Sequence, residues 1–264
     1  MTLLQRPITS HLVKGKTMFH AVLVGINTSI QYHAMGADLN GCVPDADHWN
    51  AEIANLPVTS HIVTLKDDAA NKAAILSAIQ ECAAAATAND EFLLMVSSHG
   101  TTKNGEHYLC TAEFDWTPDT GISASELVKA LKAFKCPVGV WIDACMDPIY
   151  GAVEKGLRTE RAVKPRLFPG TEFHAGKVRA IGDAIDESTL PLACITATGP
   201  NGFAGDGLDG GLFTTAGLAA LASTPNLTAD EIVAQIAPVL ASEGQDENSL
   251  PVAVGANTSN PFLL

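Results

Sequence analysis

Short, strongly apolar runs alternate with stretches of helical spacing along most of the chain. The apolar runs have the length and bulk of buried strands and lie at 19–26, 60–66, 91–97, 137–144 and 190–197. Helical spacing or helix-start residues mark 44–55, 71–87, 123–134, 212–222 and the stretch that begins at Thr228. Because strands alternate with helices, the pattern predicts an α/β domain with a mostly parallel central sheet flanked by helices.

Individual residues indicate where two of the helices begin and where one of them is expected to kink or end early. Capping boxes predict helix starts at Ser123-x-x-Glu126 and at Thr228-x-x-Glu231. Pro238 falls inside the second of these helices, and it is expected to kink or shorten that helix because proline lacks a backbone N–H.

The pattern predicts a single domain over 19–264 that follows a short N-terminal extension, 1–18. Residues 106–113 are expected to form a short hairpin arm. The segment 146–189 has few periodic apolar residues and holds seven of the sixteen Lys and Arg side chains. A stretch of this length without regular structure is usually functional or disordered in a compact domain, so a long basic loop is expected there.

The charge and the distribution of apolar residues limit the kinds of molecule and compartment that the protein would suit. The 264 residues carry a formal net charge of −13, which argues against nucleic acid or an anionic membrane as a partner and suits a cationic substrate. No run of about 18 apolar residues occurs, and the first 18 residues lack the apolar core of a secretory signal. Most of the six cysteines lie inside apolar runs, as free thiols do in a reducing compartment, so a cytoplasmic protein is expected.

Candidate chemistry lies at the carboxyl ends of two strands, where open α/β sheets place their sites. His99 follows the third predicted strand and Cys145 follows the fourth. If these strands pair, an imidazole and a thiol face one crevice, as catalysis by a thiolate requires. The backbone N–H groups of Gly100 and Cys145 would then point at a substrate carbonyl oxygen. The alternative is that His99 and Cys145 have only a structural role, because a single Cys or His at a strand end is more often a packing residue.

Four motifs occur in order over residues 19–222, most of the chain: AVLVGIN with LNGCVPDADHW, EFLLMVSSHG, VWIDAC and DGGLFTTAGLAAL. Together they resemble the metacaspases and the prokaryotic caspase-like peptidases (orthocaspases) of the caspase clan, peptidase family C14. The resemblance implies a caspase–hemoglobinase fold and a cysteine endopeptidase that cleaves after Arg or Lys with a His99–Cys145 dyad. The interval of 46 residues from His99 to Cys145 is close to the roughly 50 residues of caspases.

The resemblance also implies a specificity pocket, S1, lined by Cys42, Asp45, Ser97 and Asp143. Carboxylates around a narrow pocket would hold a guanidinium or an ammonium by charge-assisted hydrogen bonds, and they would repel a substrate Asp. Structural alternatives stay open for both acids. Asp45 also suits the start of a helix, and Asp143 ends a buried strand and needs a polar partner in any case.

The basic segment suggests self-cleavage. A pocket specific for Arg and Lys, attached to a long basic loop, would be expected to cut that loop, with Arg158 and Arg161 as candidate sites. A solvated charged loop explains the same residues equally well. Two departures from the family pattern are Met146-Asp147-Pro148 in place of His-Ser-Gly, and Ser98 in place of the Gly before the histidine. The first of these keeps a second class open, a catalytically weak or inactive caspase-like module for interaction or signalling, although the intact His99–Cys145 pair opposes that class.

The sequence requires no cofactor, and no metal-binding residue is assigned, because the Cys and His residues lack the spacing of a zinc site. Many metacaspases depend on calcium, so calcium activation stays open. Glu113, Asp115 and Asp119 are better explained as a solvated turn than as the set of about six to eight oxygens that calcium needs. Nucleotide-binding and serine-hydrolase motifs are absent. By resemblance, we expect a monomer that acts on proteins or peptides with Arg or Lys at P1, the residue before the cleaved bond.

Overall fold

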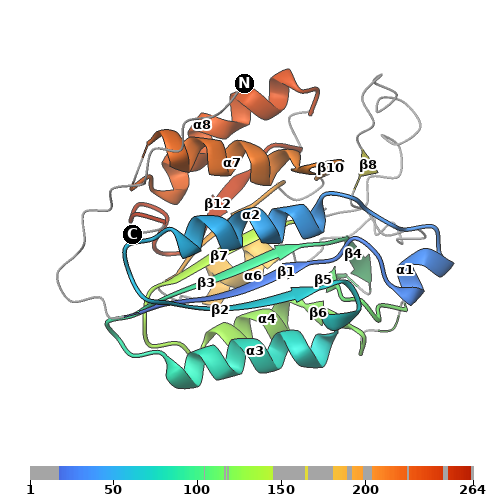
Figure 1. The fold of residues 1–264 in the computed structure, drawn as a ribbon, viewed down its shortest axis with the longest axis horizontal. Coiled ribbons are helices and arrows are strands. Elements are labelled where there is room, and N and C mark those ends of the chain that lie inside the picture. The colour runs from blue at the N-terminus through green and yellow to red at the C-terminus, as the bar shows by residue number, and fades with distance from the viewer. Residues whose placement is uncertain are drawn as a thin grey trace.

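A six-stranded sheet forms the centre of the molecule (Figure 1). The computed structural model describes residues 18–103, 105–115, 117, 119–144, 164–165, 181–188, 192–198, 204–224, 226–245 and 249–262. In the order in which they pair, the strands are β12 (Val252–Val254), β9 (Leu192–Thr196), β7 (Val138–Asp143), β3 (Glu91–Ser97), β1 (Phe19–Gly25) and β2 (Ser60–Lys66). All neighbouring pairs are parallel except β12–β9, so the mostly parallel sheet predicted from the sequence is confirmed.

Helices cover both faces of this sheet (Figure 1). One face carries α2 (Cys42–Ala54), α7 (Leu212–Ser223) and α8 (Ala229–Ser242). The opposite face carries α3 (Lys72–Ala85), α4 (Ala124–Leu131) and α6 (Ile181–Ser188). Successive residues of a strand point to opposite faces. On β1, Leu23 therefore belongs to the core under α2, and Val22 and Val24 belong to the core over α3.

The core under α7 is built around Trp141 of β7. Its ring stacks on Phe213 with 4.2 Å between centroids and meets Trp49 of α2 edge-on at 5.2 Å. A Cβ on Gly217 would lie 2.2 Å from the Trp141 ring. Because neither the helix backbone nor a buried indole can give way by that much, α7 packs at this distance only with a glycine at position 217.

Smaller elements lie at the edges of the sheet. One antiparallel sheet consists of β4 (Gly100–Lys103), β5 (Glu106–Cys110) and β6 (Gly121–Ser123). Another consists of β8 (Lys164–Pro165), β10 (Gly205–Gly207) and β11 (Gly210–Gly211). A short helix, α1 (Ile30–Ala34), and a 3-10 turn, η1 (Asp67–Ala69), complete the described elements.

Both capping boxes are present as predicted. The Ser123 and Thr228 side chains accept the amides of Glu126 and Glu231, and each glutamate bonds back to the amide of its cap residue. The expected shortening at Pro238 is wrong, because α8 continues past this residue to Ser242.

The expectation of a loop throughout 146–189 is wrong at two places: residues 164–165 form the short strand β8, and residues 181–188 form α6. Ile181, Ala184 and Ile185 are buried there. This spacing fits one helical face, but it is too short to stand out in the sequence. The N-terminal extension lies outside the described residues except for Met18.

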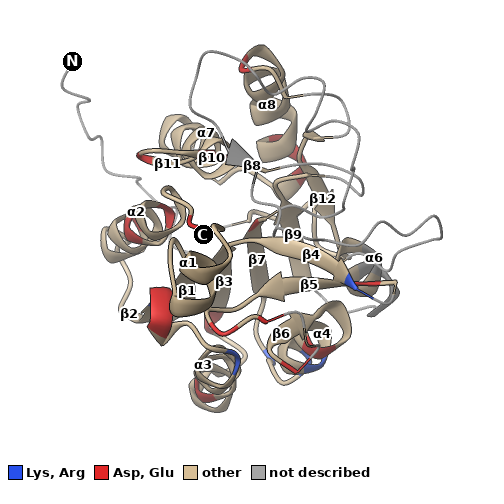
Figure 2. Cartoon of the chain, turned by 90° about the vertical axis from the view of Figure 1, so that its right-hand side faces the viewer, with Lys and Arg blue, Asp and Glu red and all other residues tan. Residues whose placement is uncertain are grey.

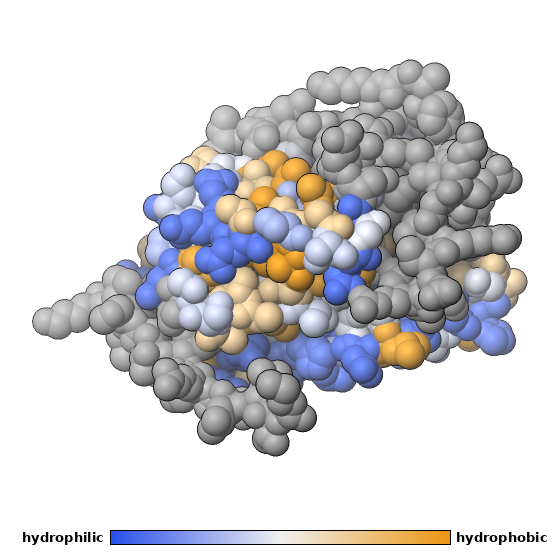
Figure 3. Space-filling model, turned by 90° about the horizontal axis from the view of Figure 1, so that it is seen from above, coloured by the Kyte–Doolittle hydropathy of each residue, from blue (hydrophilic) through white to orange (hydrophobic). Residues whose placement is uncertain are grey.

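No helix within the described parts of the chain is both long and apolar enough to cross a bilayer. Figure 3 looks onto the molecule from above the view of Figure 1, and hydrophilic and apolar residues are interspersed over the described surface in this view. Val239 of α8 is 49% exposed, so apolar side chains on this helix are not confined to its buried face.

Candidate functional site

The carboxyl ends of β3 and β7 meet in register at one edge of the sheet. Ser97 lies opposite Asp143, and the amide of Ser98 donates to the Asp143 carbonyl (3.3 Å). His99 follows two residues after Ser97. Cys145 follows two residues after Asp143 and lies outside the described residues. The pairing of the two strands is confirmed, and the contact between His99 and Cys145 stays a prediction.

The imidazole of His99 is buried and held on two sides. It is 2% exposed, its Nε2 lies 2.6 Å from the carbonyl oxygen of Ala37, and Tyr32 packs edge-on against it at 5.1 Å between centroids. Tyr32 is fixed in turn, because its hydroxyl donates to the Cys110 carbonyl (2.9 Å) and burial raises its pKa well above the ordinary value. A carbonyl oxygen only accepts a hydrogen bond, so Nε2 carries a hydrogen, and in the neutral form of the ring the lone pair is therefore on Nδ1.

The backbone after His99 is arranged by β5. The amide of Cys110 donates to the His99 carbonyl (3.0 Å), and Gly100 pairs with Leu109. In an antiparallel ladder, this bond makes Gly100–Leu109 a pair whose own N–H groups point away from the partner strand. The Gly100 amide therefore faces away from β5. The hydroxyl of Ser98 also donates to the His99 carbonyl (3.0 Å), so the serine that replaces the family's glycine stabilises this turn.

Asp45 joins three segments of the chain. It lies in the first turn of α2, where the helix dipole favours an acid, and it is completely buried. Its Oδ2 accepts the hydroxyl of Ser97 (2.7 Å) and its Oδ1 accepts the amide of Gly211 (2.8 Å). Gly210 has a φ of +136°, and a Cβ there would come within 2.9 Å of the carboxylate. A glycine thus lets the β10–β11 hairpin approach Asp45.

Asp143 is held by the start of α7. Its Oδ2 accepts the hydroxyl of Thr214 (2.7 Å) and the Thr214 amide (3.3 Å). The same hydroxyl accepts the indole N–H of Trp141 (3.0 Å). One threonine therefore ties the carboxylate at the end of β7 to the aromatic core beneath it, and both carboxylates of the predicted S1 set lie on the α2–α7 face of the sheet.

The loop before α2 is fixed by two side chains from elsewhere. Asp206 of β10 accepts the amide of Gly41 (2.8 Å). The side-chain oxygen of Asn27, just after β1, accepts the amides of Cys42 (2.8 Å) and Val43 (3.0 Å). These bonds cap α2, whose N-cap residue is a glycine without a side chain, and they hold Cys42 in the buried first turn.

Figure 2 looks onto this edge of the sheet. Acidic residues colour α2 and the β10–β11 hairpin, whereas the basic residues visible in this view lie on α3, α4 and the β4–β5 hairpin. Lys66 at the end of β2 is an exception, since it forms an ion pair with Asp47 of α2. The side of the edge that carries Asp45 is therefore negative.

The structure thus brings together most of the predicted site. The residues that it places at this edge are His99, Gly100, Cys42, Asp45, Ser97 and Asp143. Cys145 and the candidate cleavage sites, Arg158 and Arg161, lie outside the described residues. Sequence reasoning missed the residues that position this set, which are Asn27, Tyr32, Asp206 and Thr214. Asn27 and Thr214 fall inside the quoted motifs AVLVGIN and DGGLFTTAGLAAL, so the signal for these two was present.

The acidic stretch after β5 is part of a turn. The Asp115 carboxylate accepts the hydroxyls of Thr117 (2.6 Å) and Thr120 (2.8 Å), and these bonds lower its pKa. Glu113 accepts the amide of Lys72 at the start of α3 (3.1 Å). These contacts agree with the solvated turn expected from the sequence.

Comparison with known proteins gives a family and a fold. A family model described as a caspase domain matches residues 18–260. Among solved structures, the crystal structure of protein GSU0716 from Geobacter sulfurreducens superposes with a TM-score of 0.68 at 19% identity, over 90% of this chain and 94% of that chain. At that identity the likeness shows the fold alone. No curated protein matches the chain.

The hydrogen bonds of Thr214 to Asp143 and Trp141 lead to a prediction about stability. Thr214→Val keeps a β-branched side chain but removes the acceptor of the indole N–H and a donor to Asp143, so we expect a loss of about 1–3 kcal/mol in the free energy of unfolding. Thr214→Ser keeps the hydroxyl and should lose clearly less. Urea denaturation measures both, with Thr215→Val on the exposed side of α7 as the control. Equal stability of the Val and Ser variants would contradict the assignment.

Proposed function

The chain belongs to the caspase-domain family, and on that footing we propose that it is a cysteine endopeptidase that cleaves after Arg or Lys, with Cys145 as nucleophile and His99 as base. Membership in the family supports a cysteine peptidase. The observation that carries the finer proposal is the pair of buried carboxylates, Asp45 and Asp143, that flank Ser97 two residues before His99.

The proposed reaction follows from the orientation of His99. Its Nε2–H is committed to the Ala37 carbonyl, so Nδ1 would take the proton of the Cys145 thiol. The thiolate would attack the carbonyl carbon of the scissile bond, and the amides of Gly100 and Cys145 would stabilise the oxyanion. The imidazolium would then return its proton to the leaving amine, and water would hydrolyse the thioester to release the second product and the thiol.

The proposed specificity follows from charge. Asp45 and Asp143 receive hydrogen bonds from hydroxyl and amide groups, which disperse a negative charge without cancelling it. A guanidinium or an ammonium from the substrate would supply the opposite charge. A substrate Asp would bring a third carboxylate to the same place, and its repulsion would exclude it.

Self-cleavage fits the same site. Asp45, Ser97 and Asp143 are inaccessible to solvent, so the proposed S1 pocket would have to open before a substrate side chain could enter. Self-cleavage has the same requirement, because Arg158 or Arg161 of the basic segment would have to enter the pocket before the chain is cut. The charge of that segment suits the negative edge of the sheet.

The specificity proposal predicts hydrolysis of fluorogenic peptides with Arg or Lys at P1 but not with Asp. Cys145→Ala should abolish it. Asp45→Asn and Asp143→Asn should each lower kcat/KM for the Arg peptide by roughly 10- to 100-fold, since each removes a charge-assisted contact. Asp115→Asn, which changes an exposed acid in a turn, is the matched control. A positional-scanning library read at P1, with and without calcium, measures these effects.

Two results would contradict the proposal. A preference for a P1 side chain other than Arg or Lys would remove the role of the two carboxylates. An absence of hydrolysis across the whole library, with and without calcium, would favour the alternative class, a caspase-like interaction module, to which the Met146-Asp147-Pro148 segment already points.

The self-cleavage proposal predicts a change of mass. Purified wild-type protein should yield fragments whose new carboxyl terminus is Arg158 or Arg161, and Cys145→Ala should stay intact. Arg158→Gln with Arg161→Gln should also stay intact while it keeps its folded stability. Intact-mass spectrometry after incubation measures this. Identical masses for wild type and Cys145→Ala would rule out self-cleavage.

A further inference from the structure

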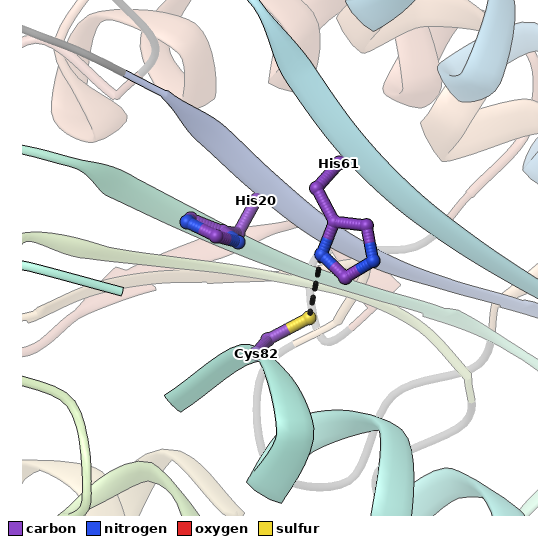
Figure 4. A group of neighbouring side chains, drawn as sticks. All are labelled: His20, His61 and Cys82. Atoms are coloured by element: carbon purple, nitrogen blue, oxygen red, sulfur yellow. Dashed lines mark hydrogen bonds between the residues drawn. The ribbon is translucent and has the colours of Figure 1, made fainter. Parts of the chain in front are cut away.

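A second group of reactive side chains lies at the opposite, amino-terminal end of the sheet. His20 of β1 and His61 of β2 are paired across the parallel ladder, so both project from the same face. Cys82, near the end of α3, approaches them from the covering helix (Figure 4). The Cys82 Sγ lies 4.0 Å from the His61 Nδ1, and one ligand atom from each of the three residues lies within 4.8 Å of the others.

His20 is the residue that packing alone does not explain. It is 1% exposed, yet neither of its ring nitrogens has a hydrogen-bond partner among the described residues. A buried polar atom left in this state usually costs about 1–3 kcal/mol. The ring of His61 stands perpendicular to it, with 5.6 Å between centroids. The nearest acid is Asp90, whose Oδ2 lies 3.9 Å from the His20 Nε2.

The donor set suits one class of ion. Two imidazoles and a thiolate are ligands for zinc and for other borderline transition metals, whereas calcium and magnesium require oxygen. Burial lowers the pKa of His20, and the nearby carboxylate of Asp90 opposes this shift. Burial raises the pKa of the Cys82 thiol to about 11, and a bound cation would displace that proton.

We propose that His20, His61 and Cys82 form a binding site for a zinc-class divalent ion, with Asp90 as an outer carboxylate that orients His20. In a tetrahedral zinc site the ligand atoms lie about 3.4–3.6 Å apart. The present separations of up to 4.8 Å would reach that range if side-chain rotations moved each ligand atom by about 1 Å or less. With three protein ligands, the fourth coordination position of the ion would be left for water or another ligand. His61 is exposed to solvent, which gives the ion a route of entry.

The site would be structural or regulatory and separate from the proposed catalytic centre. Gly25, which pairs with Ser97, lies five residue steps along β1 from His20, so the two ends lie roughly 16 Å apart along the strand. A bound ion would join β1, β2 and α3. No zinc-site spacing occurs in the sequence because these ligands come from three separate elements, and only the parallel register brings the two histidines together.

The test uses the full-length Cys145→Ala variant, which lacks the proposed catalytic thiol as a competing ligand. Zn²⁺ is titrated in competition with a chromophoric chelator, and Co²⁺ is added separately as a spectroscopic probe. We expect one equivalent of metal, a thiolate-to-cobalt absorption band, and a rise of about 5–10 °C in the unfolding midpoint at a hundredfold excess of Zn²⁺ over its dissociation constant.

Variants assign the ligands. Cys82→Ser should remove the cobalt band, and His61→Ala should weaken zinc binding by about tenfold or more. Because His61 is exposed, its loss should leave stability in EDTA unchanged. Cys194→Ala, which removes another buried thiol of the same core, is the matched control and should keep the band. Absence of stoichiometric binding, or binding that His61→Ala and Cys82→Ser leave unchanged, would overturn the proposal, whatever the peptidase assays show.

Discussion

The register of β3 against β7 is the constraint on which the candidate site depends. Ser97 and Asp143 lie opposite each other at the last step of the ladder and face the same side of the sheet. Ser97 therefore meets Asp45 of α2, and Asp143 meets Thr214 of α7. A slip of one residue would turn one of these side chains toward the α3 face and would separate the carboxylates. The same register ends β3 and β7 side by side, two residues before His99 and two residues before Cys145.

Buried negative charge is the second feature of this edge. A carboxylate removed from water is costly unless hydrogen bonds replace its hydration. Asp45, Asp143 and Asp206 are each buried, and each accepts bonds from amide or hydroxyl groups. Three such groups at one edge of a protein with a net charge of −13 add repulsion. A fold that keeps them there is suited to a cationic ligand, so the electrostatics of this edge support the Arg/Lys proposal independently of the resemblance to metacaspases.

The sequence predicted what depends on local pattern and on motifs. Each apolar run became a strand of the central sheet, both capping boxes formed, and Asp45 and Ser97 proved to be in contact. It did not predict the contacts that hold these residues in place. The cap that Asn27 supplies to α2 and the bridge that Thr214 makes to Trp141 depend on packing. Short elements such as α1, α6, β10 and β11 have too few residues to show a period, and the pairing of His20 with His61 follows only from strand register.

The central claim is that His99, with Nε2 bound to the Ala37 carbonyl, presents Nδ1 to the Cys145 thiol. The most direct measurement is the rate of alkylation of Cys145 by iodoacetamide as a function of pH, followed by mass spectrometry in wild type and in His99→Asn. A thiol paired with an imidazole should react with a midpoint below about pH 7.5, and loss of the ring should move the midpoint to the ordinary thiol value of about 8.5 or above. The same profile in both proteins, or an unreactive Cys145, would contradict the account.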